Sequence, residues 1–249
     1  MNLCRKWGAG RNCFSSVALG VFLLLGPGFS CFGQASYLPP GQPDGVALLA
    51  PPPLPGSEEE AADMASTRAV FRARTEGEKE HALKSSTLSF SLFNEAIGCE
   101  LELSKLPKTQ AFLEKMKKDI QGAIDLPKNH FKRKRPYEMD VSLNLGKPET
   151  SFSYPSGHST RGTVYALVFA ELFPEKREAI LQVGRDIGWD RVLIGKHFPT
   201  DVYAGRVLGQ AVFRALQANP VFQQDLAAVK AEIGEKAKKT AEKEAVLAK

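Results

Sequence analysis

Apolar residues recur at helical spacing in three long segments of the chain. In residues 86–97 and 109–126 they return every three or four positions, which places them on one face of an α-helix. A third stripe occupies residues 164–172. We predict core helices in all three segments, and we expect the first two to end at Gly98 and Pro127, because these residues disfavour helical backbone.

Further helix starts are marked by a capping residue and by prolines. Ser57 precedes three glutamates, and a serine cap followed by acidic residues stabilises the positive end of a helix. We predict a helix from here to about Arg74. Pro174 and Pro199 are typical of the first turn of two further helices. Because no segment alternates convincingly between apolar and polar residues, the chain is predicted to be all-α, a single-domain helical bundle.

Residues 1–35 have the organisation of a secretory signal peptide. Basic residues precede an apolar run over residues 14–25, a Gly-Pro pair ends the run, and residues 33–35 supply a small-x-small cleavage site. The run is shorter than the ~20 residues that span a bilayer. We therefore expect a periplasmic or secreted protein, cut after Ala35, without integral membrane association. Lipid attachment at Cys31 is the alternative.

The rest of the chain falls into three parts. Residues 36–56 are rich in proline and predict an extended arm. Residues 57–229 contain the predicted core helices and form the expected domain. Residues 230–249 consist mainly of Ala, Glu and Lys, which is typical of a solvated, partly frayed helical tail. An interaction tail is the alternative interpretation of this last part.

The net charge of the chain is +5, but three of its 33 Lys and Arg residues and none of its 28 Asp and Glu residues lie in residues 1–35. The remaining chain therefore carries only +2. A nucleic-acid partner would favour a strongly basic surface. The basic run Lys132-Arg133-Lys134 is by itself compatible with such a patch, but with so small a net charge we expect no nucleic-acid binding.

Cys99 is the one cysteine that remains after residues 1–35. The domain therefore has no intramolecular disulfide, and one cysteine with four scattered histidines gives no ligand spacing for a structural metal. We expect Cys99 to be buried as a small apolar residue; a thiol that joins two chains in a homodimer is the alternative. His81 and His130 are expected to be surface or helix-face residues.

Three segments gather cationic groups and histidines outside any amphipathic pattern: residues 128–136, 154–160 and 190–201. The second is a Pro-Gly turn that leads into an apolar helix, and the free N–H groups and positive dipole of a helix start favour a bound anion. In the third, Asp201 follows His197 closely enough to hold its imidazole in one tautomer. Phosphoryl transfer requires such a set: fixed cations, one imidazole that attacks and another that protonates the leaving group.

Three motifs in this order and spacing carry a resemblance to a known family: Lys128-x6-Arg135-Pro136, Pro155-Ser156-Gly157-His158 and Arg191-x5-His197-x3-Asp201. They resemble the three-part signature of the phosphatidic acid phosphatase type 2 superfamily, which also includes vanadium haloperoxidases. Within it the chain is most similar to the bacterial class A non-specific acid phosphatases, over about residues 36–233. The resemblance implies an all-α fold of that kind and a metal-independent, cofactor-free acid phosphatase. Its partners would be small phosphomonoesters and inorganic phosphate.

The resemblance also implies roles for individual residues. His197 would be the nucleophile that forms a phosphohistidine, and Asp201 would accept the other ring N–H of that imidazole. His158 would be the general acid for the leaving alcohol and then the base that activates water. We expect an acidic pH optimum, because the leaving group needs a protonated His158. The expected phosphate-binding groups are Lys128, Arg135, Ser156, the Gly157 backbone N–H and Arg191.

Two departures from the family pattern are visible. Asp190 stands where the family commonly has Ser, and a carboxylate here either orients Arg191 or weakens anion binding by repulsion. The loop between the first two motifs carries no cysteine, whereas some relatives brace this loop with a disulfide, so the rigidity of the loop and the substrate range that it controls are in doubt.

Three alternatives to a broad acid phosphatase stay open. The superfamily includes lipid phosphate and diphosphate phosphatases, although the lack of predicted membrane helices argues against that substrate. It also includes vanadate-dependent haloperoxidases, which are usually much longer. The third alternative is a catalytically weakened phosphate-binding protein, in which Asp190 marks the loss of activity.

Overall fold

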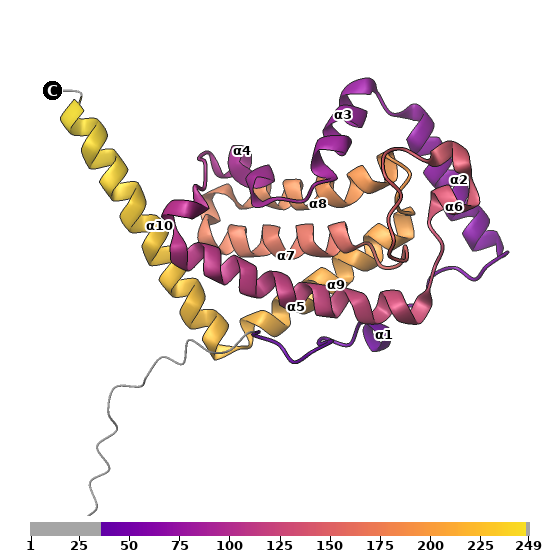
Figure 1. Cartoon of the computed structure of the whole chain (residues 1–249), viewed down its shortest axis with the longest axis horizontal. Helices are drawn as coiled ribbons and strands as arrows, with labels where there is room; N and C mark the ends of the chain where they lie inside the picture. Colours follow the sequence, from indigo (N-terminus) through magenta and orange to yellow (C-terminus); the bar gives the residue numbers. More distant parts are fainter. Residues whose placement is uncertain (1–35, 248–249) are drawn as a thin grey trace, which may run out of the picture. The chain divides into compact units, whose positions relative to one another are not determined.

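The described residues fold into α-helices joined by short 3-10 turns. The structure is a computed structural model and describes residues 36–247, so the predicted signal peptide and Cys31 lie outside it. No strand occurs among the described residues, which confirms the all-α prediction. In chain order (Figure 1) the elements are α1 (Gly45–Leu48), α2 (Glu58–Ala73), α3 (Glu76–Ser85), η1 (Phe90–Phe93), α4 (Asn94–Ile97), η2 (Leu103–Lys105), α5 (Pro107–Phe131), α6 (Pro136–Met139), η3 (Val141–Leu143), α7 (Gly157–Leu172), η4 (Pro174–Lys176), α8 (Arg177–Leu193), α9 (Pro199–Gln217) and α10 (Pro220–Leu247).

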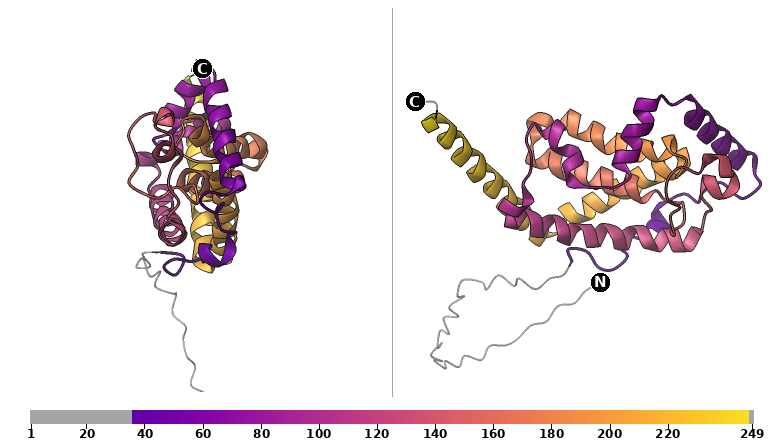
Figure 2. Two further views of the ribbon diagram at one scale, coloured as in Figure 1. Left: turned by 90° about the vertical axis from the view of Figure 1, so that its right-hand side faces the viewer. Right: turned by 45° about the horizontal axis from the view of Figure 1, so that its top comes forward.

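Helix α7 is the buried centre of this arrangement. It packs mainly against α8 and α9, and α5 lies along its other side from α8 (Figures 1 and 2). The side chains of Val164, Val168 and Phe169 are fully buried. The apolar residues of α7 lie on all sides of the helix rather than on one face. This pattern is typical of a helix that other elements cover on every side. The predicted stripe over residues 164–172 is therefore part of the central helix.

Close approach of α8 and α9 to α7 depends on glycines. A Cβ added at Gly184 of α8 would lie 2.5 Å from the Cβ of Ala166, and one at Gly205 of α9 would lie 2.6 Å from the carbonyl oxygen of Ser156. These separations are too short for non-bonded atoms, so larger side chains would push the helices apart. The contact at Gly205 holds the N-terminal part of α9 beside the start of α7, and two of the three sequence motifs lie in this region.

The predicted end of the second core helix is wrong. Helix α5 does not end at Pro127 but continues to Phe131. The ring of Pro127 is buried and packs against Gly45 of α1, where an added Cβ would lie 2.8 Å from the proline Cγ. Tertiary packing therefore compensates for the backbone hydrogen bond that a proline inside a helix removes.

The second wrong prediction concerns residues 86–97, which form the short η1 and α4 instead of one helix. Their aromatic residues still reach the core, since the ring of Phe93 lies 5.0 Å from that of Phe169. The longer helix α3 lies just before this segment and ends at Ser85. Its start is a capping box, in which Thr75 accepts a hydrogen bond from the Glu78 backbone (3.2 Å) and Glu78 accepts one from the Thr75 backbone (2.7 Å).

Cys99 is exposed, so the prediction that it is a buried apolar residue is wrong. It follows Gly98, which ends α4 with a positive φ of 84°, and the chain leaves the core at this turn. The predicted helix after Ser57 is confirmed, and the Ser57 hydroxyl accepts a hydrogen bond from the Glu60 backbone at 3.1 Å. Pro199 occupies the first turn of α9, as predicted.

The arm and the tail are both attached to α5. The backbone N–H of Tyr37 donates to Asp119 of α5 at 2.9 Å, and the Tyr37 ring packs edge-on against Phe222 of α10. Glu232 of α10 accepts hydrogen bonds from the backbone of Lys108 (3.0 Å) and Thr109 (2.8 Å), in the first turn of α5. The C-terminal half of α10 then extends beyond the other helices (Figure 2, right). None of the helices in residues 36–247 is long and apolar enough to cross a membrane.

We predict that Gly184→Ala destabilises the fold. The new Cβ would meet Ala166 across the α7–α8 contact, and overpacking of this kind costs about 1–3 kcal/mol in the free energy of unfolding. Thermal denaturation of purified protein measures the effect. Gly234→Ala is the control, because nothing lies within 4 Å of its added Cβ and alanine favours a helix. Equal melting temperatures for the two variants would contradict the close-contact explanation.

Candidate active site

The three sequence motifs meet where several helices end or begin. Lys128 lies in the last turn of α5, His158 in the first turn of α7 and Arg191 in the last turn of α8. Seven of the eight candidate residues are buried, and the charges of the first and third motifs act on the histidines. The structure thus brings all the candidate residues into one region: Lys128, Arg135, Ser156, Gly157, His158, Arg191, His197 and Asp201.

In the basic run that follows α5, residues 132–135, every second side chain is buried. Lys132 and Lys134 are exposed, whereas Arg133 and Arg135 are buried. Arg133, which sequence reasoning treated only as part of a basic patch, forms ion pairs of 2.7 Å with Asp63 of α2 and with Asp201. The run is therefore an extended segment that sends two guanidinium groups into the protein.

The Asp201 carboxylate is fully buried and holds the imidazole of His197. Its Oδ2 lies 3.3 Å from His197 Nδ1 and also accepts hydrogen bonds from the Ser153 hydroxyl (2.5 Å) and the Phe198 backbone (2.9 Å). Its Oδ1 accepts from Arg133 at 2.7 Å. Ser153 was not among the sequence candidates. Because these donors saturate the carboxylate, its position and that of the imidazole are fixed.

The surroundings of His197 favour its neutral imidazole. Burial lowers its pKa well below the ordinary value, and the nearby charges of Arg135 and Lys128 lower it further. With Nδ1–H directed at Asp201, the lone pair is on Nε2, which accepts a hydrogen bond from Arg135 Nη1 at 3.3 Å. A neutral imidazole whose unprotonated nitrogen faces a cation is suited to attack an electrophile that carries anionic oxygens.

Three buried cations, Lys128, Arg135 and Arg191, form a group that we call the cationic cradle. Arg135 Nη1 donates to the Lys196 carbonyl at 2.9 Å, and its Nε donates to the Ser151 carbonyl at 2.8 Å. Arg191 is different, because its Nε and Nη1 are buried with no hydrogen-bond partner among the described residues. Buried donors of this kind are costly unless something accepts from them. These two N–H groups of Arg191 are therefore available to donate hydrogen bonds to an oxygen atom of a ligand.

Lys128 makes the charge of the cradle dependent on pH. Its ammonium group donates to the carbonyl oxygens of Phe152 and Ser153. Burial, and next the charge of Arg135, lower its pKa to about 7. Lys128 is thus charged in acid and loses its proton as the pH rises through neutrality, which favours anion binding on the acid side.

A carboxylate that sequence reasoning missed, Glu149, bridges two members of the cradle. Its Oε2 lies 2.7 Å from Arg135 Nη2, and its Oε1 forms an ion pair with Arg191 Nη2. Burial raises its pKa, but the two guanidinium groups outweigh this effect and hold it below the ordinary value. Glu149 lies in the loop between the first two motifs and fits neither of them, so the sequence offered no signal for its partners.

His158 stands at the edge of the cradle. Its Nε2 lies 3.0 Å from the carbonyl oxygen of Ser86, which fixes a proton on that nitrogen because a carbonyl only accepts. Burial, and next the charge of Arg191, lower its pKa to about 3. In the absence of a bound anion His158 is therefore neutral over most of the acid range.

The unusual residue Asp190 faces away from the cradle. Its Oδ2 accepts a hydrogen bond from Ser85 at 2.6 Å and lies 3.6 Å from His81 Nε2. Burial raises its pKa. Since the Arg191 guanidinium is paired with Glu149 instead, Asp190 neither orients that guanidinium by a hydrogen bond nor lies among the groups that would touch a bound anion.

Ser156 and Gly157 supply the helix start beside these charges. The Ser156 hydroxyl caps α7 by accepting from the Ser159 backbone at 3.3 Å, and the Ser156 backbone donates to the Asp201 carbonyl at 2.9 Å. The first N–H groups of α7 lack partners within the helix. Across the described part of the chain, no three His, Cys, Asp or Glu side chains gather in an arrangement suited to a metal ion.

An all-helical domain that places two histidines among buried cations belongs to a class of protein suited to bind an anion such as phosphate beside groups that can transfer protons. Comparison with known proteins identifies the family. Residues 119–222 match the PAP2 superfamily. The chain is 32% identical over 232 residues to a non-specific acid phosphatase of Providencia stuartii, which covers 87% of this chain and 92% of that protein. It is 31% identical over 209 residues to an acid phosphatase of Zymomonas mobilis subsp. mobilis, covering 80% of this chain and 78% of that protein.

A shorter segment is similar to another kind of phosphatase. Over 57 residues the chain is 44% identical to a lipid A 1-phosphatase of Rhizobium etli, which covers 23% of this chain and 25% of that protein. The similarity to the acid phosphatases extends over most of the chain. The protein belongs to the PAP2 superfamily and, within it, to the class A non-specific acid phosphatases; it is a phosphatase.

Glu149→Gln should strengthen the binding of inorganic phosphate. The change removes the charge that competes for Arg135 and Arg191 but keeps the side-chain size. We expect the inhibition constant for phosphate to fall about tenfold, as charge-assisted hydrogen bonds to a ligand replace those to Glu149. The phosphate-free variant should melt at a lower temperature, because two buried guanidinium groups lose their counter-charge, and added phosphate should restore the loss.

Competitive inhibition and thermal denaturation, each at several phosphate concentrations, measure these effects. Glu178→Gln, at an exposed position in α8, is the matched control and should change neither quantity. An inhibition constant for Glu149→Gln equal to that of the unmodified protein would show that Glu149 does not compete with phosphate.

Proposed function

We propose that this protein is a secreted acid phosphatase that hydrolyses phosphomonoesters of broad range, without a metal ion, through a phosphohistidine on His197. The observation that carries the proposal is the placement of that imidazole. Its Nδ1 is held by Asp201 and its Nε2 faces the cationic cradle, and burial lowers its pKa, which favours the neutral form. Secretion is supported by the signal-peptide pattern of residues 1–35.

In the first step a phosphoryl group binds with its oxygens toward the cradle. The lone pair of His197 Nε2 forms a bond to phosphorus while the bond from phosphorus to the ester oxygen breaks. His158 gives a proton to the departing oxygen, which leaves as an alcohol. Lys128, Arg135 and Arg191 neutralise the charge on the three remaining oxygens, the task that magnesium performs in other phosphoryl-transfer enzymes.

In the second step water releases the phosphate. Neutral His158 takes a proton from a water molecule, whose oxygen attacks the phosphohistidine and displaces His197 Nε2. The products are inorganic phosphate and the original neutral imidazole. The hydrogen bond to the Ser86 carbonyl keeps a proton on Nε2 of His158, so Nδ1 is the atom that gives and takes the catalytic proton.

A lipid phosphate is the second candidate substrate. It is favoured by the 57-residue similarity to a lipid A 1-phosphatase. Rates measured on a short-chain phosphatidic acid and on p-nitrophenyl phosphate, with the same preparation, distinguish the two classes. A marked preference for the lipid would replace the broad acid phosphatase with a lipid phosphatase.

His197→Ala should lose the activity. With EDTA present and in acid buffer, we expect turnover of p-nitrophenyl phosphate to fall about 10³-fold or more, as for other nucleophile deletions. The acid-labile phosphoenzyme trapped from the unmodified protein should be absent in the variant. His130→Ala, which removes an exposed histidine, is the control and should retain turnover. Ordinary turnover by His197→Ala, or loss of activity on adding EDTA to the unmodified protein, would contradict the mechanism.

The pH dependence should differ between the free and the substrate-bound enzyme. In the free protein burial and Arg191 lower the pKa of His158 to about 3, and a bound phosphoryl dianion raises this pKa by adding negative charge. Since the general acid must be protonated, kcat falls as the pH rises through the pKa of the bound state. We expect the alkaline limb of kcat to lie at least about one pH unit above that of kcat/KM. A value of kcat that increases through neutral pH would exclude His158 as the acid.

A further inference from the structure

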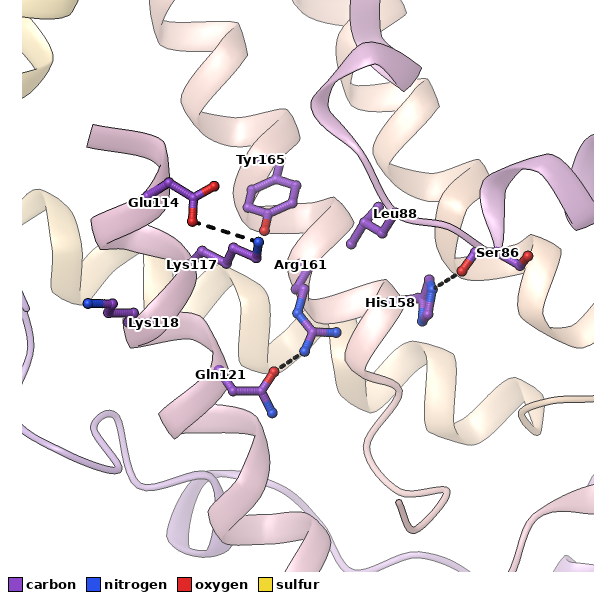
Figure 3. A pocket seen from close by; sticks show the side chains of 9 residues that line it. All are labelled: Ser86, Leu88, Glu114, Lys117, Lys118, Gln121, His158, Arg161 and Tyr165. Atoms are coloured by element: carbon purple, nitrogen blue, oxygen red, sulfur yellow. Dashed lines mark hydrogen bonds and ion pairs between the residues drawn. The ribbon is translucent and has the colours of Figure 1, made fainter. Parts of the chain in front are cut away.

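A cavity of about 590 Å³ lies beside His158, between α5, α7 and the segment that leads from α3 to η1 (Figure 3). Its wall combines apolar surface from Leu88 and the Tyr165 ring with polar groups from α5 and α7. Burial raises the pKa of Tyr165 to about 12, so its hydroxyl remains a neutral donor. The space therefore suits a small organic group with both a carbon skeleton and polar substituents.

Positive charge predominates in this cavity. Lys117, Lys118 and Arg161 line it together with a single carboxylate, Glu114. Glu114 is 3.7 Å from the ammonium group of Lys117, so at most one of these cations is neutralised. Figure 3 shows the Lys117 ammonium group and the Arg161 guanidinium directed into the same space.

Arg161 has no acidic partner within the described residues. Its Nη2 donates to the side-chain oxygen of Gln121 (Figure 3), and an amide oxygen accepts a hydrogen bond without cancelling the charge. The side chain is half-buried, where an unpaired charge is less screened than on an open surface. The group best able to satisfy Arg161 is thus an anion bound in the cavity.

The cavity and the cationic cradle adjoin each other at the start of α7. Arg161 Nη1 lies 3.3 Å from the position of a Cβ added at Gly157, whose backbone N–H belongs to the proposed phosphate site. Arg161 also contributes to the lowered pKa of both His158 and Lys128. If a phosphoryl group in the cradle has its ester oxygen at His158, the remainder of the substrate would lie in this cavity, because His158 also lines it.

We propose that this cavity is the leaving-group subsite and that it selects phosphomonoesters whose alcohol carries a second anionic group, a carboxylate or another phosphate, bound by Arg161 and Lys117. The proposal rests on the proposed function, since it places the alcohol of the same reaction. It narrows the substrate class from phosphomonoesters in general to those with two separated anionic groups.

The test compares two substrates that differ in one group. 3-Phosphoglycerate and glycerol 3-phosphate are both phosphate esters of a primary alcohol on three carbons, but the first ends in a carboxylate and the second in a hydroxymethyl group. We expect kcat/KM of the unmodified protein to be about tenfold higher for 3-phosphoglycerate, the size of effect that a charge-assisted hydrogen bond gives. Arg161→Gln should bring the ratio of the two values close to one.

The ratio separates selectivity from general damage, because any loss of folded enzyme or of chemistry affects both substrates equally. Lys117→Gln, at an exposed position of α5, is the second variant and should lower the ratio in part. Arg177→Gln, an exposed arginine at the start of α8 and outside the cavity, is the matched control and should leave the ratio unchanged.

Two outcomes count against the inference and they are distinguishable. If the unmodified protein hydrolyses both esters with equal kcat/KM, or if Arg161→Gln and Lys117→Gln leave a tenfold ratio intact, the cavity does not select an anionic leaving group, while the phosphatase function stands. If neither ester nor p-nitrophenyl phosphate is hydrolysed, the proposed function itself fails and the leaving-group subsite fails with it.

Discussion

The buried carboxylate of Asp201 accepts hydrogen bonds from Arg133, Ser153 and the Phe198 backbone and lies against the imidazole of His197. Arg133 links Asp201 to Asp63 of α2 through a second ion pair. The backbone carbonyl of Asp201 also accepts a hydrogen bond from the Ser156 backbone at the start of α7. Helices α2, α7 and α9 and the segment after α5 thus meet at one residue. A buried carboxylate is stable only when such donors surround it, so the fold and the orientation of the His197 imidazole depend on the same contacts.

The all-α fold and the cap at Ser57 could be predicted from helical periodicity and from short-range pattern. That the three motifs belong to one site was inferred from their combined chemistry and from the family resemblance, and the fold brings their residues into one region. Glu149 and Ser153 were missed because each acts through a partner that only the tertiary fold brings near. The same reason explains Pro127, whose helix-breaking tendency is overridden by packing against α1. The capping box at Thr75 was visible in the sequence and could have predicted α3.

The two acidic residues near Arg191 show why position along the chain does not give position in the site. Asp190 is its neighbour in sequence, yet the helical rotation between consecutive residues turns Asp190 toward Ser85. Glu149 is 42 residues away and forms the ion pair with the guanidinium. Asp190 therefore makes no hydrogen bond to the cationic cradle. Glu149 is the carboxylate that forms ion pairs with Arg135 and Arg191 and so reduces the net positive charge of the cationic cradle.

The distribution of charge links binding to proton transfer. In the free protein burial, and next the positive charges of Arg191 and Arg161, lower the pKa of His158 to about 3, so the neutral imidazole is favoured. An arriving phosphoryl dianion reverses the sign of the nearest charge, which favours the imidazolium form. In the proposed mechanism His158 would thus be charged only when a substrate is present to receive its proton. The Lys128 ammonium group, which is charged below about pH 7, favours binding of the anion in the same pH range, and an acid phosphatase is the enzyme that these two couplings together produce.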